Sequence, residues 1–271
     1  MAPIGLDGLA ALVPDGAHLA LPPDNSAPPS ALARALVRRA ARGLRLLGVP
    51  VSGYAADLLI GAGCVASVQT SAAMVGEAGL APRFSAAVAA GSISVIDATC
   101  PAIHTALQAA EKGVPFMPLR GVLGSDIVAH RPDWTVIDNP FANGPDPILL
   151  VAAVAPDIAA FHAACADAHG NVYVGRRREL ATMAHAARRA LVTVERMVEG
   201  DLLEDERLAP GVISGVYIEA VAIVGRGAWP AGLLDEYSLD GAHLAEYGAL
   251  AATGAGFRTY LERYVLKGEA R

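Results

Sequence analysis

Short apolar runs alternate along this chain with amphipathic helical stretches, and glycine or proline residues separate them. Runs with strand character occur at residues 17–21, 44–49, 65–72 and 92–99, and helical patterns follow several of them. Strands that alternate with helices are typical of a parallel sheet whose faces are covered by helices. The pattern therefore predicts an α/β fold with a mostly parallel sheet and flanking helices.

The second half of the chain repeats this rhythm and ends in a helical tail. Extended segments are expected at 114–121, 135–140, 148–154, 157–167 and 191–198, and helices at 31–43, 82–90, 101–112 and 180–190. Periodicity does not decide between helix and strand for residues 216–225. Because no linker or low-complexity tract interrupts the pattern, we expect a single domain over residues 1–271, with a helical extension at about 240–271.

The composition excludes two further classes of protein. Apolar residues make up 54% of the chain and charged residues 18%, whereas disorder requires low hydrophobicity and high net charge. The 27 acidic residues outnumber the 21 basic ones, which gives a net charge of −6 and argues against a nucleic-acid partner.

Neither a membrane span nor a secretory leader is expected. The longest uncharged stretch, residues 58–76, is interrupted by glycine and polar residues and is interpreted as turn, strand and turn. The N-terminal segment has no basic residue before its apolar ones and contains Asp7, unlike a signal peptide. Three widely spaced cysteines without a C-x-x-C pattern fit reduced thiols, so we expect a cytoplasmic protein.

Loops after the predicted strands carry the candidate binding residues, because ligands of open parallel sheets bind outside the carboxyl ends of the strands. The loop at residues 119–126 combines a cation, a hydroxyl group and glycines, the group types that hold a carboxylate or phosphate. In the alternative interpretation this loop is an ordinary turn whose arginine pairs with a structural carboxylate. The candidate substrate-binding residues are Ser52, Gly53, Thr99, Cys100, Arg120, Gly124 and Ser125.

Other reactive side chains give weaker signals. Cys100 precedes a helix that begins with proline, where a helix N-terminus favours a thiolate, and a buried inert thiol is the alternative. His162 stands in an apolar run and is interpreted as a hydrogen-bonded core histidine rather than a ligand. Glu77 lies near two glycines. It is interpreted either as a carboxylate nucleophile or as a residue that caps or stabilises the loop. The sequence lacks P-loop, G-x-S-x-G and H-E-x-x-H motifs, and we expect no metal and no bound cofactor.

An ordered series of motifs resembles one known family over nearly the whole chain, from about residue 15 to the end. The series comprises Gly76-Glu77, the Pro-Phe-Met-Pro run at 115–118 into Arg120 and Gly124-Ser125-Asp126, Asp167 with Gly170-Asn171, the Val-Thr-Val-Glu run at 192–195 and the Gly-Ala-Trp-Pro run at 227–230. In this order the motifs resemble the alpha (A) subunit of family I coenzyme A transferases.

The resemblance implies a fold related to sugar-phosphate isomerases, with coenzyme A thioesters as substrates and a homologous B subunit for a partner. In such enzymes a glutamate of the B subunit, in a Ser-Glu-Asn-Gly motif, attacks the acyl-CoA thioester, and coenzyme A passes to a second carboxylic acid. This sequence contains no Ser-Glu-Asn-Gly, so we expect a heteromeric transferase whose catalytic residue lies in the partner chain. Some of the apolar excess would face that partner, and the isolated chain should self-associate or be poorly soluble.

The sequence departs from the family pattern at its first glycine-rich loop. Pro22-Pro23-Asp24 stands where the family has glycines, and two prolines remove the N–H donors that an oxyanion site needs. A CoA-ester hydrolase or a ring-cleaving hydrolase of the same fold is therefore the alternative function. Cys100 occupies the place of an acidic residue of the ring-cleaving relatives, which argues against their reaction. A non-catalytic ligand-binding module is a more distant alternative.

Overall fold

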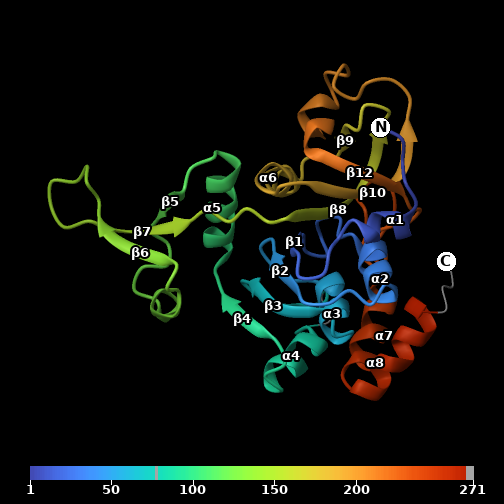
Figure 1. Cartoon of the computed structure of the whole chain (residues 1–271), viewed down its shortest axis with the longest axis horizontal. Coiled ribbons are helices and arrows are strands. Elements are labelled where there is room, and N and C mark those ends of the chain that lie inside the picture. Colours follow the sequence, from blue (N-terminus) through green and yellow to red (C-terminus); the bar gives the residue numbers. More distant parts are fainter. Residues whose placement is uncertain (77–78, 267–271) are drawn as a thin grey trace.

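A large sheet of mostly parallel strands forms the centre of the protein, whose computed structural model describes residues 1–76 and 79–266 (Figure 1). Seven neighbouring strands of this described part run parallel. Their order is β12 (Ile218–Ile223), β10 (Ala190–Val198), β8 (Ile158–Asp167), β1 (His18–Leu21), β2 (Leu44–Gly48), β3 (Val65–Thr70) and β4 (Ser94–Asp97). The short strand β9 (Val172–Tyr173) pairs antiparallel with the end of β8, and β11 (Val212–Ile213) pairs antiparallel with β9.

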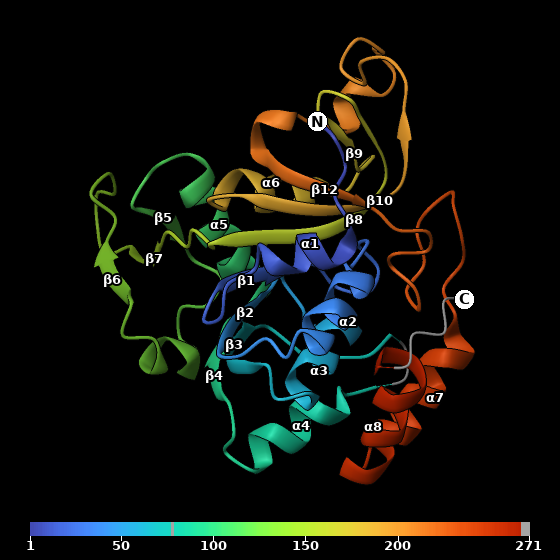
Figure 2. The ribbon, with the colours of Figure 1, turned by 45° about the vertical axis from the view of Figure 1, so that its right-hand side comes forward.

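Helices cover both faces of this sheet. In β1, Leu19 and Leu21 enter one hydrophobic core and Ala20 enters the other, because successive side chains of a strand point to opposite faces. Helices α1 (Leu6–Ala11), α2 (Ser30–Arg38), α3 (Tyr54–Gly61), α4 (Pro82–Ala89), α7 (Gly241–Ala251) and α8 (Gly254–Leu261) pack on the first face, and α5 (Cys100–Glu111) and α6 (Arg178–Ala186) on the second. Figure 2 shows the two layers from the side.

A small antiparallel sheet lies apart from the large one, on the far side of α5 (Figure 1). Its strands follow the order β5 (Phe116–Leu119), β7 (Pro147–Ala152) and β6 (Trp134–Asp138). The sheet is anchored by a separate core in which Trp134, Leu149 and Val151 pack against Ala102 and Ala106 of α5. The sequence predicts these strands but not that they leave the main sheet.

The predicted α/β architecture is confirmed, with one local correction and one open alternative resolved. The interpretation of residues 58–76 as turn, strand and turn is wrong at its start, because residues 58–61 complete helix α3. All but one residue of that helix are buried, so it lacks the polar face that marks a helix in sequence. The undecided segment at 216–225 contains β12, a strand that pairs with β10.

The predicted helical extension is confirmed as α7, α8 and a π-helical turn, η4 (Glu262–Leu266). Tyr247 and Tyr260 of these helices are fully buried against Tyr54 of α3, and the Tyr54 and Tyr260 hydroxyls lie 2.8 Å apart. The extension is therefore part of the first core. Shorter 3₁₀ turns are η1 (Asp126–His130), η2 (Ala209–Gly211) and η3 (Gly215–Tyr217). None of the helices in the described ranges has both the length and the apolar character to cross a membrane.

Candidate functional site

An apolar pocket of about 670 Å³ opens where β1, β2 and β3 end. Its floor and sides come from the three loops that follow these strands, and segment 232–239 forms the remaining wall. This is the edge of a parallel sheet where ligands usually bind. The lining residues with apolar side chains are Pro23, Pro50, Val51, Met74, Leu233, Leu234, Tyr237 and Leu239.

Asp24 is the acid of the apolar pocket and is only 8% exposed. Its carboxylate accepts hydrogen bonds from the backbone N–H groups of Tyr54 (2.8 Å) and Gly76 (3.0 Å). Burial raises the pKa of Asp24 to about 6, although these two hydrogen bonds act to lower it. Asp24 thus ties together the loops after β1, β2 and β3. A β-carbon at Gly53 would lie 2.7 Å from the Asp24 carboxyl carbon, so this contact requires glycine.

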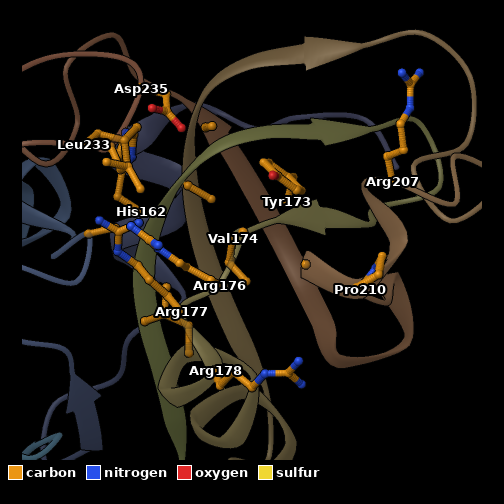
Figure 3. Close-up of a pocket in the computed structure, with 17 residues that line it drawn as sticks. His162, Tyr173, Val174, Arg176, Arg177, Arg178, Arg207, Pro210, Leu233 and Asp235 are labelled. Atoms are coloured by element: carbon orange, nitrogen blue, oxygen red, sulfur yellow. The ribbon is translucent and has the colours of Figure 1, made fainter.

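A second, more polar pocket of about 540 Å³ adjoins the first. The two pockets share Arg177, Leu233 and Leu234. Arg176, Arg178 and Arg207 also line the second pocket, which lies against β8 and β9 (Figure 3). Guanidinium groups are suited to carboxylate and phosphate ligands, so this part of the site is built for an anion.

His162 of β8 forms part of the wall of the second pocket and is fully buried. Its Nδ1 lies 2.8 Å from Thr193 Oγ1, and its Nε2 lies 2.7 Å from Glu195 Oε1. Burial acts to raise the pKa of Glu195, but hydrogen bonds from His162 and from the Arg226 backbone hold that pKa below its usual value. Both ring nitrogens are engaged inside the protein, which confirms that His162 is a hydrogen-bonded core histidine.

Four of the seven candidate binding residues follow β2 and β4, the strands on either side of β3. Ser52 and Gly53 precede α3, and the buried Ser52 hydroxyl has no hydrogen-bond partner among the described residues. Thr99 caps the N-terminus of α5, and Cys100 is exposed at its first turn. The Cys100 sulfur lies 3.2 Å from the hydroxyl of Ser71, which follows β3. Of these four, Gly53 lines the apolar pocket.

The other three candidates lie in the loop that follows β5 in the small sheet. Arg120 forms a two-point contact with Asp146, with one distance of 2.7 Å, and lowers the pKa of that carboxyl group to about 2. Gly124 has a φ of +80°, and the Ser125 hydroxyl donates to the Val122 carbonyl (2.8 Å). No hydrogen bond or ion pair in the described parts of the chain joins these three residues to the first four. Arg120 therefore pairs with a carboxylate of the chain, as expected in the alternative interpretation of this loop as an ordinary turn.

Sequence reasoning missed Asp24, Arg177 and Tyr237 as residues of the pockets. Asp24 directly follows the two prolines that depart from the family pattern, and Arg177 is the centre of three consecutive arginines, so both positions carried a signal. Tyr237 gave none, because tertiary packing alone brings segment 232–239 over the strand ends. The residue Glu77 lies outside the described residues. The described residues include no group of three His, Cys, Asp or Glu side chains that could hold a metal ion.

The fold and the strand-end pockets define an α/β protein with a ligand site at the carboxyl edge of a parallel sheet. Comparison with known families identifies it further. The family model described as coenzyme A transferase matches residues 6–222. The chain therefore belongs to the coenzyme A transferase family.

Individual relatives cover most of the chain. An uncharacterized protein of Archaeoglobus fulgidus is 32% identical over 85% of this chain, which spans about half (51%) of that relative's length. The A subunit of the 3-oxoadipate CoA-transferase of Pseudomonas knackmussii is 28% identical, over 93% of this chain and 89% of its own length. The cholesterol ring-cleaving hydrolase IpdA subunit of Rhodococcus jostii is also 28% identical, over 88% of this chain and 82% of its own.

Solved structures confirm the fold. The crystal structure of glutaconate coenzyme A-transferase from Acidaminococcus fermentans superimposes with a TM-score of 0.88 at 22% identity, over 99% of this chain and 90% of that chain. The structure of a variant of the decarboxylase AibA/AibB gives a TM-score of 0.83 at 26% identity, over 97% and 98%. Proteins named for different reactions thus share this fold, so function has to be argued from the site.

Proposed function

We propose that this chain is the A subunit of a heteromeric CoA transferase that moves coenzyme A between an acyl-CoA and a carboxylic acid. The observation that carries the proposal is the match to an A subunit over nearly the full length of both chains, in a protein that lacks the Ser-Glu-Asn-Gly motif. The nucleophilic glutamate would then come from a homologous B subunit. We further propose that the complex is cytoplasmic.

The proposed reaction exchanges the thioester twice at that glutamate. The glutamate carboxylate attacks the thioester carbonyl and the C–S bond breaks. The coenzyme A thiolate departs, and an acyl-glutamyl anhydride remains on the enzyme. The thiolate then attacks the glutamyl carbonyl and displaces the first acid, which leaves a glutamyl-CoA thioester. The same two steps then occur in reverse with the acceptor acid. Its carboxylate attacks the glutamyl-CoA thioester, and the released thiolate attacks the acceptor's carbonyl in the resulting anhydride, so that the glutamate is regenerated and the acceptor departs as the new acyl-CoA.

This chain would supply the wall that holds the acid and excludes water. The apolar pocket lies at the strand ends, and Gly53 and Asp24 shape its base. Removal of water matters because the anhydride and the enzyme thioester are both open to hydrolysis. Of the sequence candidates, Ser52, Thr99 and Cys100 stay proposed contacts at the same edge, and Arg120, Gly124 and Ser125 stay proposed contacts from the small sheet.

Exposed apolar side chains of the small sheet support the proposal of a partner chain. The Phe141 side chain between β6 and β7 is 94% exposed, and Phe116 and Val136 are about half exposed at 47% and 45%. Obligate interfaces are more apolar than ordinary surface. We propose these exposed side chains as candidate contacts with the B subunit.

The proposal is tested by assaying coenzyme A transfer with the chain alone and after co-purification with a homologous chain that carries Ser-Glu-Asn-Gly. We expect no transfer from the isolated chain and transfer by the complex, lost when the partner's glutamate is replaced by alanine. Full transfer by the isolated chain would contradict the division of labour.

The same assay separates the second candidate, a CoA-ester hydrolase, which the Rhodococcus jostii relative favours. A hydrolase releases coenzyme A with water alone, whereas a transferase requires the acceptor acid. Ligand binding without turnover in the complex would instead identify a non-catalytic binding module.

A further inference from the structure

Asp24 places a negative charge at the base of the apolar pocket, and no basic side chain of the described residues forms an ion pair with it. Its two carboxylate oxygens each accept one hydrogen bond, from the backbone N–H groups of Tyr54 (2.8 Å) and Gly76 (3.0 Å). The charged side chain that acts on its pKa is a second acid, Asp57. At pH 7.5 the Asp24 carboxyl group is ionised, because its pKa is about 6. A carboxylate oxygen has two lone pairs, so each oxygen can accept from one further donor.

The loop around Asp24 keeps this carboxylate in place. Pro22 and Pro23 precede it, and their rings restrict the backbone φ angles. Gly53 lies so close that a β-carbon there would be 2.7 Å from the Asp24 carboxyl carbon. A buried charge is costly without a partner of opposite charge, and the apolar side chains of the pocket supply none. A ligand that fills the pocket can supply that partner.

Arg177 is the second charged residue in the described lining of the apolar pocket, and it lies where this pocket meets the second one. The lining of the second pocket includes Arg177 but not Asp24. The Arg177 Nη2 donates to the Asn25 carbonyl (3.5 Å), and its buried Nε–H has no hydrogen-bond partner in the described part of the chain. No ion pair joins Arg177 to Asp24. The described lining of the apolar pocket therefore carries one cation and one anion at separate places, and its formal charge is zero.

We propose that the apolar pocket selects carboxylic acids that carry an ammonium group at the far end of an apolar chain, with Asp24 as the residue that determines this specificity. The inference rests on the proposed function. The reacting carboxylate would lie at Arg177, the chain would lie between Met74 and Leu233, and the ammonium group would donate to Asp24. Each charged side chain of the pocket would then contact a ligand group of opposite charge.

Two other kinds of acid fit this arrangement of charges less well. A dicarboxylic acid would bring its second carboxylate to Asp24, and like charges repel strongly at a site from which water is excluded. A hydroxy acid can donate a hydrogen bond to Asp24, but its hydroxyl group leaves the buried charge without an opposite charge. The negative charge at the base of the pocket therefore favours an ammonium group over a carboxylate or a hydroxyl group.

The test measures binding by calorimetry at pH 7.5 to the full chain, because both charged residues belong to it. The probes are 5-aminopentanoate, 5-hydroxypentanoate, pentanoate and glutarate, which have the same carbon number and differ only at the far end. We expect 5-aminopentanoate to bind about tenfold more tightly than pentanoate, as for one hydrogen bond between charged groups. Glutarate should bind most weakly of the four.

Asp24→Asn keeps the shape of the side chain and removes its charge. The affinities for 5-aminopentanoate and pentanoate should then lie within about threefold of each other, while pentanoate stays within about twofold of its wild-type affinity. Asp157→Asn is the matched control and should change no affinity. Asp157 also accepts a backbone hydrogen bond, from His18 (2.9 Å), but it lines neither the apolar nor the second pocket. Arg177→Met should weaken 5-aminopentanoate and pentanoate by similar factors, since both acids carry the same carboxylate.

Three results would overturn the inference. The first is wild-type binding of pentanoate, 5-hydroxypentanoate or glutarate at least as tight as that of 5-aminopentanoate. The second is an undiminished preference for 5-aminopentanoate in Asp24→Asn, and the third is a loss in Arg177→Met that is confined to one of the two acids. The first comparison uses the wild type alone, so it decides the matter even if Asp24→Asn does not fold.

These measurements need no turnover and are therefore independent of the transfer assay. A preference for 5-aminopentanoate in a complex that transfers no coenzyme A would contradict the proposed function alone. Coenzyme A transfer by a complex that binds glutarate more tightly than 5-aminopentanoate would contradict this inference alone.

Discussion

Replacement of Asp24 by asparagine tests the electrostatics of the apolar pocket. Burial raises the pKa of Asp24 from 3.8 to about 6, so the carboxyl group binds its proton more tightly in the folded than in the unfolded chain. This protonation stabilises the folded state fully below pH 3.8, and the contribution is lost as the pH rises through about 6. At about 1.4 kcal/mol for each pKa unit, the whole contribution is about 3 kcal/mol.

The measurement is the free energy of unfolding in urea at pH 5 and pH 7.5, for wild type and Asp24→Asn. About 1.4 kcal/mol of the total falls inside this window by the same linkage relation. Asparagine does not titrate, so the stability of the wild type relative to the variant should increase by about that amount from pH 7.5 to pH 5. Loss of one of the two backbone hydrogen bonds adds an offset at both pH values.

Asp240→Asn is the matched control, because Asp240 also accepts a backbone hydrogen bond, from His243 (3.0 Å), but has a lowered pKa. The Asp240 carboxyl group is ionised in the folded and the unfolded chain from pH 5 to pH 7.5. The difference in unfolding free energy between wild type and Asp240→Asn should therefore be the same at both pH values. An Asp24 difference that is equally flat would refute the reasoning that burial keeps this carboxyl group protonated near pH 5.

Three other substitutions test separate parts of the structure. Gly53→Ala places a β-carbon 2.7 Å from the Asp24 carboxyl carbon and should lower the unfolding free energy by about 1–3 kcal/mol. The control Gly121→Ala adds a β-carbon that meets no atom within 4 Å and should change the unfolding free energy little. Equal effects of the two variants would exclude a clash between the Gly53 β-carbon and Asp24. Asp146→Asn should lower the urea midpoint of unfolding at pH 6. The difference in midpoint between wild type and variant should shrink as the pH falls from about 4 toward 2, because the paired carboxyl group has a lowered pKa, and also as salt is added. A midpoint difference that is independent of pH and salt would contradict the ion pair with Arg120. Phe141→Ser should reduce self-association of the isolated chain in sedimentation experiments while the melting temperature stays within about 2 °C, because this side chain is 94% exposed; unchanged association would remove it from the interface.

Local patterns carried most of the element assignments. Strand β8 is recognisable because ten residues in a row are almost all apolar, as a central parallel strand requires. Helix α3 was missed for the opposite reason, since burial on nearly all sides removes the polar face that periodicity detects. The same limit applies to the small sheet, whose strands are visible as local patterns although their pairing depends on contact with α5.

Of the seven candidate site residues, Gly53 alone lines the apolar pocket of the described structure. The rule that ligands bind at strand ends led to the choice of Ser52 and Gly53, and both residues lie at the edge of the sheet where the apolar pocket opens. Arg120 satisfied the same chemical criterion, but the structure gives it a carboxylate partner in Asp146. Sequence lists the charged groups and cannot show which of them already have partners.

The sequence by itself determined the alternation of strands and helices, the family resemblance and the absence of the family's catalytic motif, because each is a property of residues near one another in the chain. Only the tertiary structure decided that segment 232–239 closes the apolar pocket, that Asp24 is buried, and that Arg177 lies between the two pockets without an acidic partner among the described residues. These facts depend on contacts between residues far apart in the chain. Local residue patterns do not specify these long-range contacts, and the contacts determine which side chains are buried and which are paired.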